Sequence, residues 1–134
     1  MKSFMGWALV SILLILSSFR TTHEPGSYNL EAVATAFRSG NINQLSPYLD
    51  IRVDISLPDK SDTYSKSQAE MVISDFFNVH GVRNFKIFQQ GNTAEFLFCT
   101  GLLQTYSGNY RTMLFFKQKG QKQLLQEIRF QAVE

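Results

Sequence analysis

Cysteine is almost absent from this chain of 134 residues, which contains one cysteine, Cys99, and two histidines. A single thiol can form neither an intramolecular disulfide nor a multi-cysteine metal site, so packing alone has to stabilise the fold. Cys99 follows the apolar residues 96–98, which predicts a buried and unreactive side chain. Neither His23 nor His80 has a second histidine or carboxylate at helical spacing, and we expect no metal and no cofactor.

The chain also lacks an excess of charge of one sign, with 13 basic and 11 acidic side chains. Two of the basic residues, Lys2 and Arg20, precede the main body of the sequence, which leaves 11 basic against 11 acidic residues in the remainder. Binding to nucleic acid normally requires a basic stripe that neutralises phosphates, and none is present. We therefore expect no nucleic-acid partner.

Recognisable catalytic and phosphate-binding motifs are missing as well. There is no glycine-rich loop after a strand, no Gly-x-Ser-x-Gly elbow and no internal repeat, which argues against phosphoryl transfer and serine hydrolysis. Asp59 and Asp62 share one polar loop, where two carboxylates without further spaced oxygens are typical of a solvated turn.

The first twenty residues have the pattern of an export signal. A basic start at Lys2 precedes an apolar run over residues 4–16, and Ser17 and Ser18 follow. The run is shorter than the roughly 20 residues that span a membrane comfortably, but no clean cleavage site follows it. Residues 1–20 are therefore either a signal peptide or a signal anchor. We expect an exported protein, periplasmic or extracellular, which stays membrane-anchored if the signal is not cleaved and has no stable span if it is.

A polar tether over residues 21–28 is expected to precede one domain of residues 29–134. The domain opens with an amphipathic helix, for which Asn29 is a plausible N-cap and Gly40 a stop. A short helical turn follows over residues 41–49. The apolar stripe of the first helix consists of Leu30, Val33, Ala34 and Phe37.

Alternation of apolar and polar residues predicts a strand over residues 51–57, and residues 58–62 are expected to form a loop. Ser65 and Gln68 form a capping box at the start of a second long helix that ends near Gly81. Short turns separate the remaining strands, which predicts antiparallel neighbours. We expect an α+β fold with the helices on one side of the sheet. The four last strands are predicted over residues 85–90, 94–103, 110–117 and 124–133.

The last strand shows which face of the sheet should meet the helices. Leu124, Ile128 and Phe130 alternate on one face together with Gln126, and we assign that face to the helices. Polar side chains on it would either line a pocket or be core residues whose polar groups are satisfied locally. The pocket candidates are Tyr48, Tyr110, Thr112 and Gln126.

The opposite face carries apolar residues at its centre, which predicts that something covers it. A second copy of the protein is one candidate, and loops of a strongly curved sheet are the other. Glu127 and Arg129 lie two apart on this face and are expected to form a surface pair or an interface contact. The residues assigned to a dimer face are Arg111, Met113, Phe115 and Arg129.

Several short motifs resemble a family of small exported bacterial proteins of unknown function, a branch of the nuclear-transport-factor-two-like superfamily. The resemblance covers nearly all of residues 29–131 and implies a cone-shaped, cystatin-like fold with a pocket between helices and sheet. Where this family would have a histidine before Gly91, the chain has Gln89 and Gln90. The motifs are Ser39-Gly40-Asn41, Leu57-Pro58-Asp59-Lys60, Tyr64-Ser65-Lys66-Ser67-Gln68-Ala69-Glu70, Asp75-Phe76-Phe77, Phe85-Lys86-Ile87, Gly108-Asn109-Tyr110-Arg111 and Gln126-Glu127-Ile128-Arg129.

Enzymes of this superfamily place an Asp or His base beside a Tyr donor in the pocket. Here Asp54 falls on the polar face of its strand, and His80 is expected to serve the end of its helix. The leading hypothesis is thus a non-enzymatic module of the cell envelope that binds a small apolar ligand or another protein. The alternatives are a lyase or isomerase acting on a small apolar molecule, which needs a base inside the cavity, and a dimeric structural subunit.

Overall fold

A computed structural model describes the backbone of residues 25–134 and the side chains from Asn29 onward. The predicted signal of residues 1–20 lies outside these described residues. Within them, no helix is both long enough and apolar enough to cross a membrane. The elements are α2 (Pro25–Ser39), α3 (Ile42–Leu45), the 3-10 helix η1 (Ser46–Tyr48), β1 (Leu49–Ser56), β2 (Ser61–Ser65), α4 (Lys66–His80), β3 (Val82–Asn92), β4 (Phe96–Thr105), β5 (Gly108–Lys119) and β6 (Lys122–Val133).

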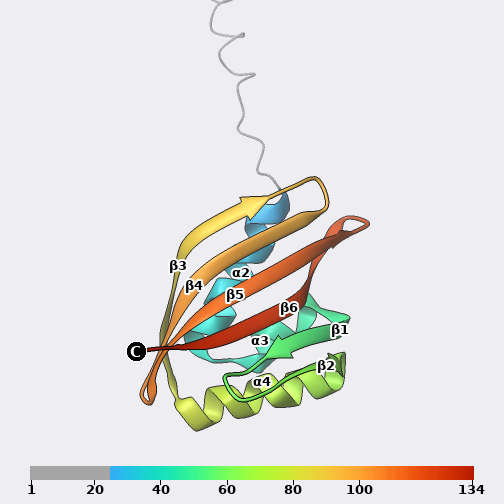
Figure 1. Ribbon diagram of the computed structural model, residues 1–134. Coiled ribbons are helices and arrows are strands. Elements are labelled where there is room, and N and C mark those ends of the chain that lie inside the picture. Colours follow the sequence, from blue (N-terminus) through green and yellow to red (C-terminus); the bar gives the residue numbers. More distant parts are fainter. Residues whose placement is uncertain (1–24) are drawn as a thin grey trace, which may run out of the picture.

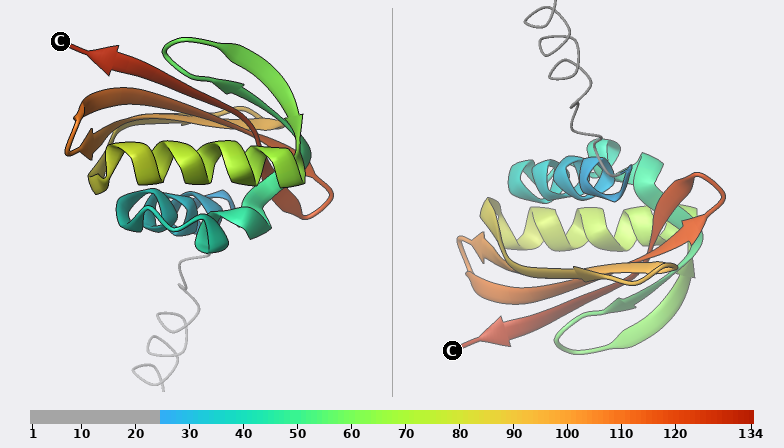
Figure 2. Two further views of the ribbon diagram at one scale, coloured as in Figure 1. Left: turned by 90° about the horizontal axis from the view of Figure 1, so that it is seen from below. Right: turned by 90° about the horizontal axis from the view of Figure 1, so that it is seen from above.

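The six strands form one sheet in the order β2-β1-β6-β5-β4-β3. The pair β1 and β6 is parallel, and the other neighbours are antiparallel. The sheet curves around the helices, which lie on one side of it (Figures 1 and 2). Packing helices on one face leaves the other face of the sheet to solvent or to a partner. The predicted α+β class, with helices against a curved and mostly antiparallel sheet, is confirmed.

Phenylalanine rings from both long helices and the sheet meet in the core. Phe37 on α2 is fully buried, and its ring centroid lies 5.5 Å from that of Phe77 on α4. The same ring lies 5.2 Å from Phe85 on β3 and 6.3 Å from Phe130 on β6. Such aromatic contacts add to the stabilisation from buried area alone. The stripe that the sequence predicted for α2 is therefore the stripe that faces the sheet.

The capping box predicted at the start of α4 is present. The hydroxyl of Ser65 accepts from the backbone N–H of Gln68 at 3.4 Å, and the Gln68 side chain accepts from the Ser65 N–H at 3.3 Å. These contacts satisfy two donors that a helix start leaves free. At the other end Gly81 has φ +68°, a conformation that glycine adopts without a side-chain clash. The helix therefore begins and ends where the sequence indicated.

Two elements differ from the expectation. Helix α2 begins at Pro25, inside residues 21–28 that were predicted to be a tether; proline is tolerated in a first helical turn because its missing N–H would be unpaired there. Strand β2 occupies part of the predicted loop. Its mostly exposed residues lack the apolar alternation of a strand, and the strand forms because it pairs with β1. Thr63 Oγ1 on β2 also donates to Asp54 Oδ1 on β1 at 2.6 Å.

The third difference is a bulge in β6. The register between β5 and β6 shifts between Phe115 and Phe116, where Gln126 is the additional residue. A bulge reverses the alternation of faces on one side of it. Leu125 is consequently buried in the core and Leu124 is half-buried on the other face, the reverse of the predicted assignment.

Candidate ligand-binding pocket

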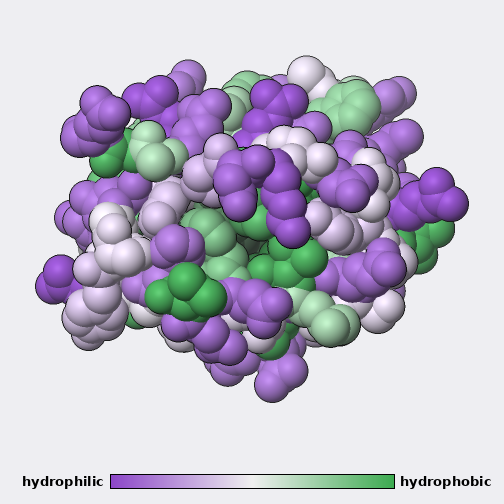
Figure 3. Space-filling model, turned by 60° about the horizontal axis from the view of Figure 1, so that its bottom comes forward, coloured by the Kyte–Doolittle hydropathy of each residue, from purple (hydrophilic) through white to green (hydrophobic). Residues whose placement is uncertain are grey.

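A pocket of about 400 Å³ opens between α4 and the turn that joins β1 to β2. Seen from the α4 side, the molecule has a hollow with hydrophobic residues gathered around it (Figure 3). Deeper inside, Phe76 stacks on Phe130 with centroids 4.3 Å apart, so the interior of the cone is filled and the free volume lies at its mouth. The lining residues are Leu57, Pro58, Asp59, Lys60, Val72, Asp75, Phe76, Val79, His80 and Tyr110.

Two residues from different elements form a polar contact on the pocket wall. His80 is the last residue of α4, and Tyr110 lies near the start of β5. Nδ1 of His80 lies 3.2 Å from the phenolic oxygen of Tyr110 and 2.5 Å from Oγ of Ser107. The ring of Phe76 packs against both, with centroids 4.4 Å from His80 and 5.1 Å from Tyr110. The pair is therefore fixed in place by hydrogen bonds and by an aromatic neighbour.

This arrangement can exchange hydrogen bonds with a ligand. A phenol donates and accepts, and an imidazole has one ring nitrogen of each kind when neutral. The charged lining residues Asp59, Lys60 and Asp75 stand beside the apolar wall. Among residues 29–134, no three histidine, cysteine or acidic side chains come close enough to hold a metal ion.

Of the four residues predicted to line a pocket, one lines the pocket between α4 and the β1–β2 turn and three lie elsewhere. Tyr110 lines it, with its side chain 8% exposed. Thr112 is fully buried in the sheet and donates to the backbone carbonyl of Tyr110 at 3.2 Å. Tyr48 is half-buried against the core, and Gln126 contacts Asp50; neither lines this pocket.

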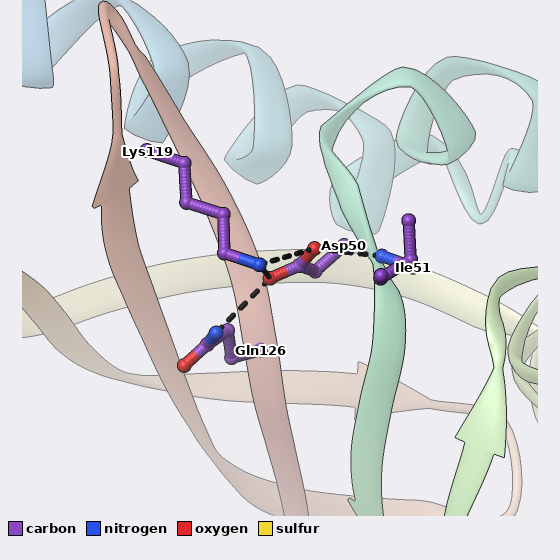
Figure 4. Close-up of polar contacts among 4 residues, drawn as sticks. All are labelled: Asp50, Ile51, Lys119 and Gln126. Atoms are coloured by element: carbon purple, nitrogen blue, oxygen red, sulfur yellow. Dashed lines mark hydrogen bonds and ion pairs between the residues drawn. The ribbon is translucent and has the colours of Figure 1, made fainter.

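Asp50 is the buried acid that sequence reasoning overlooked (Figure 4). Its Oδ2 lies 2.8 Å from Nζ of Lys119 and accepts from Nε2 of Gln126 at 3.0 Å, while Oδ1 accepts from the N–H of Ile51 at 2.7 Å. Burial opposes its ionisation, but the hydrogen bonds from Lys119, Gln126 and Ile51 outweigh burial and hold the pKa of Asp50 below its usual value. The contact joins the start of β1 to the β5–β6 hairpin.

The residues assigned to a dimer face lie on the side of the sheet away from the helices. Arg111 and Arg129 are exposed, and Met113 and Phe115 are half-buried. Arg129 Nε forms an ion pair with Glu127 Oε2 at 2.6 Å, as the sequence suggested, and its guanidinium lies 5.9 Å from the centroid of Phe115. Neighbouring side chains thus shield part of this face. Dimerisation itself stays a prediction.

His80 is the pocket residue whose role the sequence concealed. Its place before Gly81 suggested a helix end, and it does occupy the last turn of α4. Its ring also faces Tyr110, which is thirty residues later in the chain. Only the packing of α4 beside β5 brings the two together.

The fold and pocket place the chain in a class of α+β proteins in which helices fill the concave side of a curved sheet and leave a cavity at its open edge. Within that class, the family model described as "Domain of unknown function (DUF4783)" matches residues 30–131. The chain belongs to this family. No match was found among curated proteins.

Solved structures agree with this assignment. The crystal structure of a DUF4783 family protein from Bacteroides uniformis ATCC 8492 is 35% identical, with a TM-score of 0.76 over 78% of this chain and 96% of that chain. One from Bacteroides ovatus ATCC 8483 is 30% identical, with a TM-score of 0.75 over 77% and 94%. An NTF-2 like protein of unknown function from Burkholderia xenovorans LB400 is 10% identical, with a TM-score of 0.64 over 82% and 85%, and shows the fold alone. The predicted nuclear-transport-factor-two-like fold is confirmed.

Proposed function

We propose that this protein is a non-enzymatic binding module that holds a small, largely apolar molecule in the pocket between α4 and the β1–β2 turn. The observation that carries the proposal is an open cavity with apolar walls and a fixed His80–Tyr110 pair. Its volume of about 400 Å³ lies within the range of pockets that hold small ligands. The export pattern of residues 1–20 adds the cell envelope as the place of action.

The walls indicate what the ligand should look like. Apolar contact with the ligand comes from Leu57, Val72, Phe76 and Val79. This contact contributes affinity but does not fix the orientation of the ligand. The orientation has to be fixed by a polar group of the ligand that forms a hydrogen bond with the hydroxyl of Tyr110 or the ring of His80. We expect an apolar body with one hydrogen-bonding group.

A lyase or isomerase is the second candidate, and one observation favours it. The sequence had shown no base for a pocket, whereas His80 and Asp75 both line this one. Proton abstraction needs a base held beside a donor in a site that excludes water. Asp75 is exposed at the open rim, and for that reason binding remains the preferred function.

The pocket is tested by filling it. Val72 lines the pocket and Met71, next to it on α4, is 68% exposed. N-phenyl-1-naphthylamine, an apolar dye that fluoresces when it leaves water, serves as the probe. We expect Val72→Trp to weaken dye binding at least tenfold and Met71→Trp to leave it within about twofold, because only Val72→Trp places an indole in the cavity. Equal binding by both variants would exclude this pocket.

The enzymatic alternative is tested separately. Native mass spectrometry of the purified protein identifies any small molecule that accompanies it. A molecule whose mass and chromatographic retention are both unchanged after incubation with the protein supports binding, because an isomerase changes the retention and not the mass. Conversion that is lost in His80→Ala would establish the enzyme instead.

A further inference from the structure

One end of the sheet gathers two hairpins and the start of the first helix. The β3–β4 and β5–β6 turns lie at the end where α2 begins (Figure 1). The N–H of Gln118 donates to the carbonyl of Glu95 at 2.8 Å, which joins the two hairpins. Asn29 Nδ2 donates to the carbonyl of Gln123 at 3.1 Å, which joins α2 to the second hairpin. These contacts make the end a single continuous surface.

Lysines crowd the β5–β6 hairpin at this end. Lys119 and Lys122 are paired directly across its strands and both are exposed. Like charges in such a pair reduce stability, and the ion pair of Lys119 with Asp50 offsets only one of them. Lys117 and Lys122 form no ion pair with any carboxylate of the described residues. The charges of Lys117 and Lys122 therefore remain for a partner, beside one exposed carboxylate in the β3–β4 turn, that of Glu95.

Exposed phenylalanines lie beside these lysines. Phe96 is 44% exposed and pairs across the strands with Lys117. Phe98 is 37% exposed on the same face. Their chain neighbours Leu97 and Cys99 are buried, so the rings point away from the core. Phe98 also has an aromatic neighbour on this face, Phe115, with ring centroids 6.4 Å apart.

The opposite side of the molecule has more exposed acidic than basic side chains, although Lys60 also lies there. The β1–β2 turn and α4 carry the exposed carboxylates of Asp59, Asp62 and Asp75. Because residues 21–134 have equal numbers of acidic and basic side chains, the lysines reflect a local separation of charge and not a basic protein. A molecule with one basic, aromatic end and one acidic side has a preferred orientation next to a charged surface.

We propose that this lysine–phenylalanine end, formed by Phe96, Phe98, Lys117, Lys119 and Lys122, docks onto a membrane surface that contains anionic lipid. Aromatic rings are favoured at the boundary between headgroups and acyl chains, and lysines are attracted to anionic headgroups. The chain upstream of α2 contains the apolar run of residues 4–16, and it joins the domain at this same end. A second copy is a poorer occupant, because two such ends would oppose lysine with lysine.

The test uses residues 25–134, because the buried core lies within residues 30–130 and solved relatives extend little beyond that region. Vesicles of phosphatidylcholine with about a quarter phosphatidylserine are sedimented with the protein. We expect the protein to bind these vesicles and to bind vesicles of phosphatidylcholine alone at least tenfold more weakly. Binding to the mixed vesicles should also weaken in about 0.5 M salt, which screens the attraction. Binding to both vesicles alike, or to neither, would overturn the proposal.

Variants locate the surface. Lys117→Glu with Lys122→Glu should weaken binding at least tenfold, as reversal of two charges at an anionic surface requires. Arg38→Glu with Arg83→Glu makes the same change of net charge at exposed residues of the opposite end, where α2 ends and β3 begins, and should bind like the wild type. If the first pair unfolds the domain, glutamine at residues 117 and 122 replaces it. An equal loss of vesicle binding in both double variants would show that only the net charge matters, which would contradict the proposal.

The aromatic part is tested in the same way. Phe96→Ser with Phe98→Ser should weaken vesicle binding at least fivefold, because exposed rings contribute by entering the headgroup boundary. Met71→Ser with Tyr106→Ser, exposed residues away from this end, is the matched control. Light scattering of each protein gives its oligomeric state. A wild-type dimer that the Phe96 and Phe98 changes dissociate, without vesicle binding, would assign this end to a second copy.

Discussion

The phenolic oxygen of Tyr110 lies 3.2 Å from Nδ1 of His80, and this contact connects the end of α4 to β5 on the wall of the pocket. Ser107 Oγ approaches the same nitrogen. His80 therefore keeps a partner when Tyr110 turns its hydroxyl toward a ligand. The pocket wall therefore holds His80 in place and still offers the hydroxyl of Tyr110 to a ligand.

Tyr110→Phe should change selectivity more than stability. Removing the hydroxyl leaves His80 with Ser107, so the free energy of unfolding should fall by no more than about 1 kcal/mol. The preference for 2-naphthol over naphthalene should decrease up to about tenfold, the value of one hydrogen bond. Calorimetric titration measures both affinities. Tyr106→Phe, an exposed residue outside the pocket, is the control, and an equal change in both variants would contradict a role for Tyr110.

Asp50→Asn should lower stability by about 1–2 kcal/mol near neutral pH, because Lys119 loses its ion pair and the buried contacts weaken. The folded pKa of Asp50 is lowered, so its contribution is present above the unfolded pKa of about 3.9 and is lost as pH falls through the folded pKa. The difference between wild type and variant should thus shrink on acidification below about pH 4. Denaturant unfolding at several pH values measures it, and a constant difference would exclude this linkage.

Gly101→Ala should destabilise the protein by about 2–3 kcal/mol through overpacking. An added Cβ would lie 2.6 Å from the ring of Phe85 and 2.7 Å from the backbone oxygen of Lys86, and neither can move away easily. At Gly91 the atoms nearest to an added Cβ belong to the ring of Phe98, at 2.4 Å; this ring is 37% exposed and can swing into solvent. Gly91→Ala should therefore cost less than about 1 kcal/mol. Thermal unfolding measures both variants, and similar decreases in Tm for Gly101→Ala and Gly91→Ala would contradict this difference in packing.

Cys99 should be unreactive in the folded protein. Its side chain is 1% exposed, and burial raises the pKa of its thiol to about 12, so the reactive thiolate is scarce at about pH 8. Ellman's reagent should modify it at least about a hundredfold more slowly in buffer than in denaturant, because reaction has to await opening of the sheet. Rapid reaction of the native protein would show that β4 opens readily.

The sequence predicted best those features that short stretches determine by themselves. The stripe of α2, the capping box at Ser65 and the inward side of Tyr110 each follow from spacing within one element. The burial of Cys99 followed in the same way from its apolar neighbours. In these places local chemistry and the final packing agree.

Features that depend on a partner strand escaped prediction. The bulge at Gln126 follows from the register between β5 and β6, and it exchanged the expected faces of Leu124 and Leu125. Strand β2 has polar residues and exists through its pairing with β1. The meeting of His80 with Tyr110, and of Asp50 with Lys119, joins residues that are distant in sequence. The spacing of apolar residues within one segment cannot predict such contacts.

The position of β6 has a consequence for how the protein is made. This strand comes last in sequence among the described elements, yet it lies between β1 and β5 and brings Leu125, Ile128 and Phe130 into the core. Until residues 122–133 leave the ribosome, the β2–β1 hairpin has no neighbour across which to join the rest of the sheet. The complete sheet therefore cannot form before residues 122–133 are available, and any product that ends before residue 122 lacks the strand that connects its two halves.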